Sequence, residues 1–97
     1  MRYYNKDDAA DREWASRVYH SALEVVNRVC RRSAKPVPVD TLYDYFRSAH
    51  PELCNDAIVD PNLPHQPKWK HLLRSAVERL KRDGVIRRVS GGWIAAD

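Results

Sequence analysis

Two histidine-containing pairs are the residues of this chain whose types could hold a metal ion. His50 precedes Cys54 by four positions, and His65 precedes His71 by six. Zinc takes imidazole and thiolate ligands in a tetrahedron, usually as two close pairs. One pair here spans a helix end and a loop, and the other spans a proline and a helix start, which matches known zinc spacings poorly. We therefore predict no metal site. We interpret the four as a surface histidine, a half-buried structural cysteine and two histidines beside the basic helix described below.

Catalytic motifs are absent from the sequence. It contains no glycine-rich phosphate loop, no nucleophile elbow and no compact cluster of acidic residues with a lysine such as a metal-dependent nuclease needs. We therefore predict that the chain is not an enzyme, binds no cofactor and has no small-molecule substrate.

Positive charge is concentrated in one segment of the chain. Between His65 and Arg88 there are eight Lys or Arg against Glu78 and Asp83, a net charge of +6, whereas the whole chain carries +4. The rest of the chain must therefore carry −2. A solvated helix face is the common explanation for a charged helix. A basic segment beside an acidic remainder is also the electrostatic pattern of a nucleic-acid-binding protein, and the elements predicted below favour that interpretation.

The basic segment has the pattern of a helix followed by a hairpin. Over residues 66–83 the apolar residues recur at helical spacing, and we place Pro67 in the first turn of this helix. Gly84 is a C-terminal stop signal. Residues 85–89 and 93–96 flank Ser90-Gly91-Gly92, which predicts a β-hairpin. We call this hairpin the wing. The predicted core face of the helix consists of Trp69, Leu72, Leu73, Ala76, Val77 and Leu80.

The remaining chain predicts the elements that position this segment. We expect a flexible arm over residues 1–6 and one domain over residues 7–97. A long helix is predicted over 7–32, from its apolar stripe and from acidic residues near its start and arginines near its end. Residues 35–39 contain two prolines and predict a short strand that joins the wing. Asp40 is the expected N-cap of a helix over 41–49, and 50–65 is expected to be a long turn-rich loop.

Composition sets the broad class of the protein. Ninety-seven residues make one domain with a modest core, and two cysteines are too few for a disulfide framework. The sequence has no signal peptide and no long apolar run, so we predict a cytoplasmic protein, associated with the nucleoid if it is bacterial, with no membrane partner.

The order of predicted elements is that of a mainly α fold with a small β wing, namely a winged helix-turn-helix domain. The run from Trp69 to Ile86, followed by Gly92-Trp93, resembles winged helices of restriction systems, including the N-terminal domain of Mrr-type proteins. The front half, from Ala22 through Val37-Pro38-Val39 to Leu42, is similar to the HARE helix-turn-helix family. These resemblances imply a domain that senses particular or modified duplex DNA.

Our expectation from the sequence is a non-catalytic module that binds double-stranded DNA. The N-terminal half of the basic helix would meet base edges, its other cations would contact phosphates, and the wing would reach backbone or minor groove. Two alternatives stay open: a protein-interaction adaptor with anchors among Tyr3, Tyr4, Trp14, Tyr43 and Tyr45, and a docking subunit of a larger nuclease or regulatory assembly. A further alternative is a homodimer through the first helix, with Trp14 and Tyr19 packing on a second copy. The predicted DNA-binding residues are His65, Gln66, Lys68, Lys70, His71, Arg74, Ser75, Arg79, Lys81, Arg82, Arg87 and Arg88.

Overall fold

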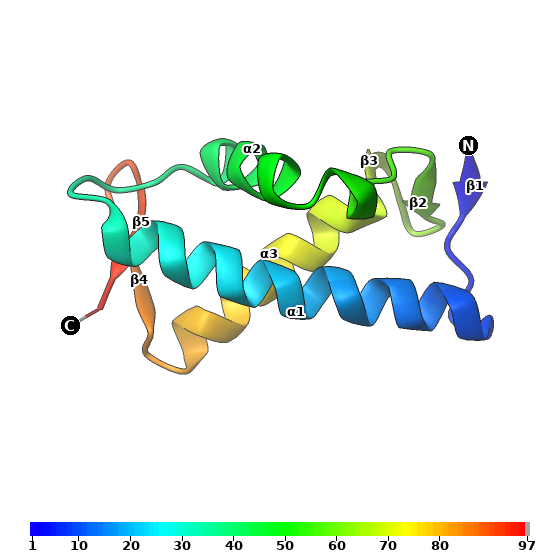
Figure 1. Ribbon diagram of the computed structural model, residues 1–97, viewed down its shortest axis with the longest axis horizontal. Coiled ribbons are helices and arrows are strands. Elements are labelled where there is room, and N and C mark those ends of the chain that lie inside the picture. Colours follow the sequence, from blue (N-terminus) through cyan, green and yellow to red (C-terminus); the bar gives the residue numbers. More distant parts are fainter. Residues whose placement is uncertain (97) are drawn as a thin grey trace.

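The computed structural model describes residues 1–96 and contains three helices and two small sheets (Figure 1). α1 (Ala9–Arg32) runs the length of the molecule, with α3 (Lys68–Arg82) crossing it and α2 (Val39–Ala49) lying alongside. One sheet contains β1 (Arg2–Tyr3), β2 (Ile58–Asp60) and β3 (Leu63–Pro67), and the other contains β4 (Ile86–Val89) and β5 (Gly92–Ala95). Within residues 1–96 no helix combines the length and apolarity needed to cross a membrane. The fold is therefore mainly helical, as predicted.

α1 confirms the long helix expected over residues 7–32. It begins after Asp8, whose side chain accepts a hydrogen bond from the Asp11 backbone N–H, an N-cap that satisfies one otherwise unpaired donor. Arg31 and Arg32 lie in the last turn, where positive charge opposes the negative end of the helix dipole. The helix stops at Ser33, just before the extended Lys35-Pro36 segment.

α2 begins two residues earlier than the sequence predicted, so the assignment of Asp40 as its N-cap was wrong. The N-cap is Pro38, and no side chain caps the helix. Proline fits this boundary because its fixed φ and missing N–H disrupt nothing there. Asp40 lies instead in the first turn, where its charge favours the positive end of the helix.

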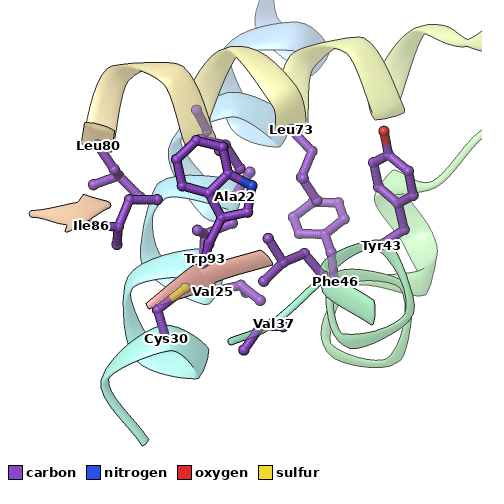
Figure 2. Packing of buried hydrophobic residues seen from close by; sticks show 14 of the residues in the cluster. Ala22, Val25, Cys30, Val37, Tyr43, Phe46, Leu73, Leu80, Ile86 and Trp93 are labelled. Atoms are coloured by element: carbon purple, nitrogen blue, oxygen red, sulfur yellow. The ribbon is translucent and has the colours of Figure 1, made fainter. Parts of the chain in front are cut away.

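The core is formed where the three helices and the wing meet. α1 contributes a stripe that includes Val18, Ala22 and Val25, and α2 contributes Leu42 and Phe46, all essentially inaccessible to solvent. Figure 2 shows aromatic and aliphatic side chains from α1, α2, α3 and the wing directed into this one cluster. The sequence assigned both Trp69 and Trp93 to the core, and the structure confirms this with exposures of 0% and 7%.

The predicted β-hairpin is also confirmed, with a third strand segment beside it. β4 and β5 pair antiparallel, with Ile86 opposite Ala95 and Val89 opposite Gly92. Val37 forms a β-bridge to Trp93, and each backbone N–H donates to the other residue's carbonyl at 2.9 Å. The predicted short strand of residues 35–39 is thus this single bridge. It fixes the hairpin to the connection between α1 and α2.

Two predictions about irregular segments were wrong. The expected loop over 50–65 contains a 3-10 turn (Pro51–Leu53), β2 and most of β3. The expected flexible arm contains β1, which pairs parallel with β2 so that Arg2 lies opposite Ile58. The Arg2 guanidinium also donates two hydrogen bonds to the buried Asp11 carboxylate, at 2.7 and 2.9 Å. β1, β2 and β3 form one sheet, which we call the N-terminal sheet, and its strands β2 and β3 contact α3 near its start (Figure 1).

Candidate nucleic-acid interface

The basic helix is shorter at its start than the predicted span of 66–83. α3 begins at Lys68 with Pro67 as its N-cap, so Pro67 is not in the first turn and Gln66 lies in β3. Gln66 is half-buried, and within residues 1–96 its side-chain oxygen is buried without a hydrogen-bond partner. His65 is exposed in the same strand. Both residues therefore precede the helix that was expected to present them.

The solvent-facing surface of α3, which we call the outward face, carries most of the predicted phosphate-binding cations. Two of these cations have acidic neighbours: Arg79 pairs with Asp83, the C-cap of α3, at 2.8 Å, and Lys81 approaches Glu78 at 4.0 Å. Exposed pairs of this kind contribute little to stability and are screened by salt, so a phosphate could replace the carboxylate. The residues of the outward face are Arg74, Ser75, Glu78, Arg79, Lys81 and Arg82, all exposed.

Two lysines near the start of α3 are already engaged within the molecule. Lys68 Nζ lies 2.9 Å from Asp60 Oδ2 and 4.7 Å from the centre of the Tyr4 ring, and only 16% of its side chain is exposed. Lys70 Nζ lies 5.0 Å from the centre of the Tyr43 ring on α2, a cation–π distance. In this conformation the Lys68 ammonium joins α3 to the N-terminal sheet through its ion pair with Asp60, so it is not free to bind a phosphate.

His71 does not lie on the open surface where the sequence placed it. Its exposure is 8%, because Leu63 of β3 covers it and shares a hydrogen bond with its ring, Nε2 to carbonyl oxygen at 3.2 Å. Its other ring nitrogen, Nδ1, contacts the guanidinium of Arg74. The helical pattern could not reveal this burial, because His71 lies far from the apolar stripe and is covered by a strand that was predicted to be a loop.

A shallow hollow of about 530 Å³ runs along the outward face. Tyr19 of α1, Leu63 of β3 and several residues of α3, including His71 and Arg74, line it. Three arginines contribute to its lining, and they are Arg74, Arg79 and Arg82. The surface can therefore accept several negatively charged groups in a row.

The two wing arginines are exposed on β4. Arg87 and Arg88 occupy adjacent positions, so their side chains alternate across the hairpin. The Arg88 guanidinium lies 5.8 Å from the centre of the Trp93 ring, which directs it over the hairpin surface. The wing thus adds two cations at the C-terminal end of α3, while the N-terminal sheet lies at the opposite end (Figure 1).

The histidine and cysteine pairs of the sequence do not come together. Cys54 Sγ donates to the His50 carbonyl oxygen at 3.4 Å, and His71 is bonded to Leu63 and Arg74. In the part of the chain that the structure describes, no group of three His, Cys, Asp or Glu is placed to hold a metal ion. Burial raises the pKa of the Cys54 thiol to about 11, which keeps it protonated and unreactive at neutral pH.

Most aromatic residues considered as anchors for a partner protein are used within the chain. Tyr43 is buried, and Trp14 is half-buried and donates from Nε1 to the Leu53 carbonyl oxygen at 3.1 Å. Tyr4 is half-buried, packing near Trp14 and under Lys68. Tyr3 and Tyr45 remain exposed, at 57% and 52%.

Comparison of the chain with protein-family models, with curated proteins and with solved structures finds no match.

Proposed function

We propose that this chain is a winged helix-turn-helix domain that binds double-stranded DNA without catalysing a reaction. α3 is the proposed recognition helix, α2 precedes it as the first helix of the motif, and β4 and β5 form the wing. The Val37–Trp93 bridge supports this assignment, since it joins the connection between α1 and α2 to the hairpin as a third strand segment.

The observation that carries the proposal is a set of arginines with no competing carboxylate. Among residues 1–96, Arg74, Arg82, Arg87 and Arg88 form no ion pair within 4.0 Å, although they lie on adjacent elements and are all exposed. Unpaired guanidinium groups concentrated on one helix and its hairpin repel one another in the free protein. Neutralisation by DNA phosphates would relieve that repulsion and release counterions from the DNA.

The proposed roles follow from position along α3. Arg74 lies in the N-terminal half of the helix and would meet base edges in the major groove, where arginine pairs bidentately with guanine. Arg82 lies at the C-terminal end and would contact phosphate. Arg87 and Arg88 would contact the backbone beside the groove. Ser75 lies next to Arg74 on the outward face and would contribute a neutral hydrogen bond.

Charge reversal at two matched pairs tests the proposal. The variant Arg74→Glu/Arg82→Glu changes the net charge by −4 on α3, and Arg28→Glu/Arg32→Glu makes the same change at the end of α1, beside a hollow that contains no α3 residue. We expect the α3 variant to lose duplex binding by at least about 100-fold and the α1 variant to lose about tenfold or less. Equal losses in a fluorescence anisotropy titration would show that net charge, and not this surface, governs binding.

A further inference from the structure

His71 makes two hydrogen bonds that fix its protonation state. A carbonyl oxygen can only accept, so the 3.2 Å contact with the Leu63 carbonyl assigns the proton to His71 Nε2. In a neutral ring Nδ1 is then an acceptor. The guanidinium of Arg74 can only donate, and its Nη2 points to that acceptor. The two contacts therefore require the same neutral tautomer.

Burial supports this neutral form. His71 is 8% exposed, and desolvation lowers its pKa, with the charges of Arg74 and Lys68 acting in the same direction. Asp60 on β2 and the hydrogen bond to Leu63 on β3 act in the opposite direction. The other groups around the hollow are Tyr19 from α1 and Glu78, Arg79 and Arg82 from α3.

We propose that His71 is a positioning residue for Arg74, which holds the guanidinium in one orientation while neutral and releases it when Nδ1 is protonated. This inference rests on the proposed function, in which Arg74 meets base edges. A fixed guanidinium loses less conformational entropy on binding than a free one, so its orientation favours one base arrangement over others.

Protonation of His71 should raise the affinity for any DNA duplex but lower the preference for one sequence over another. A protonated His71 adds one positive charge to the hollow and so strengthens contact with any phosphate backbone. It also removes the acceptor that orients Arg74, and discrimination between sites then falls. A residue with a merely structural role would weaken binding to all sequences together.

The free protein provides the first test, by nitrogen NMR of the His71 ring and the Arg74 guanidinium. We expect the Nε2–H tautomer at neutral pH and Arg74 signals that shift with the same midpoint as His71, below the ordinary histidine value of about 6.5. An Nδ1–H tautomer, or Arg74 signals unaffected by the titration of His71, would overturn the positioning role. This test needs no DNA, so its failure is distinct from a failure of the proposed function.

Two substitutions separate the two hydrogen bonds. In His71→Asn the amide oxygen replaces the Nδ1 acceptor, and in His71→Gln the amide nitrogen replaces the Nε2 donor. We expect His71→Asn to keep the preference for a selected duplex over a scrambled one at all pH values. In His71→Gln the ratio of the affinities for the selected and the scrambled duplex should fall about tenfold. The wild type should lose this preference as His71 titrates, while its affinity for the scrambled duplex rises.

Two results would contradict the proposal. One is that His71→Gln keeps the preference for the selected duplex while His71→Asn loses it. The other is that the wild type keeps a constant preference over the pH range in which NMR shows His71 titrating. Thermal melting of both variants checks that each folds. The wild-type titration decides the question even if they do not.

Discussion

Arg74 is the residue on which the proposed recognition depends, because it is exposed, contacts the His71 ring and, within residues 1–96, forms no ion pair with a carboxylate. We predict that Arg74→Ala costs about 1–3 kcal/mol on a preferred duplex and flattens the difference between duplexes. Arg82→Ala is the matched control eight positions later on the same helix, where phosphate contact is expected. It should weaken all duplexes about equally and reduce the salt slope by roughly one.

The preferred duplex is obtained first, by selection from random sequences with the wild type. If both alanine variants weaken all duplexes equally and select the same sequences as the wild type, α3 is an electrostatic platform without base readout.

Asp11 links the N-terminal residues to α1 by its charge. The hydrogen bonds from Arg2 and from the Asn5 backbone N–H lower the pKa of this carboxyl to about 2, from an ordinary value of 3.8. The folded state therefore binds fewer protons than the unfolded state between those two values. The stabilisation that the ionised Asp11 carboxylate provides is present above pH 3.8 and is lost as the pH falls through 3.8 toward about 2.

We predict that Asp11→Asn removes this contribution, about 1–2 kcal/mol near neutral pH after allowance for the exposure of Arg2. Urea unfolding at several pH values measures the free energy of unfolding directly. Asp7→Asn, at an exposed position before α1, serves as the control and should change little. Parallel pH profiles for wild type and Asp11→Asn would show that the Arg2 contact does not stabilise the fold.

At the scale of elements, the wing depends on close contact between Gly92 and the Val37 bridge. Gly92 has φ +146°, and a Cβ there would overlap the Val37 backbone and lie 2.7 Å from Pro38 N. Gly84, after α3, also has positive φ, at +75°, but a Cβ there would meet open space. We predict that Gly92→Ala costs roughly 3 kcal/mol or more, and Gly84→Ala only about 1–2. Equal thermal shifts for the two variants would show that the bridge tolerates displacement.

Trp93 connects the wing to the helices, so we predict that its removal destabilises the whole fold. Trp93→Ala empties a site that is 7% exposed and should cost about 3–5 kcal/mol. Arg88→Ala removes the exposed neighbour over the same ring and should change the free energy of unfolding by less than about 1 kcal/mol. A cooperative melt of Trp93→Ala near the wild-type temperature would refute the core role.

The helices and the wing could be predicted from the sequence because each has a strong local signal. The apolar stripe of α1 and the glycine turn between β4 and β5 depend on residues close in the chain. β2 and β3 have a weaker signal, since Pro61 follows β2 directly and Pro64 and Pro67 lie within β3, so the segment resembles a loop. The pairing of β1 with β2 joins segments more than 50 residues apart, and no local pattern indicates it. The sequence missed the burial of His71 because the neighbouring segment that contacts it, β3, was predicted to be a loop.

At the scale of the whole molecule, α3 lies between two small sheets that support its ends. The N-terminal sheet contacts its start, and β4 follows its end (Figure 1). α1 crosses α3, and the outward face of α3 stays exposed apart from the Tyr19 side chain that lines its hollow. The molecule is elongated, measuring 39 × 23 × 21 Å. The positive charge is concentrated on α3 and the hairpin that follows it, while the rest of the chain carries a net charge of −2.

The most direct test of the central claim is the salt dependence of binding to a random-sequence DNA duplex. If the outward face and the wing together neutralise about four to six phosphates, the logarithm of the association constant should fall with the logarithm of salt concentration at a slope of roughly −4 to −5. We predict tight binding at low salt with that slope. No binding at low salt, or an affinity that does not change with salt, would contradict the assignment of this surface to DNA.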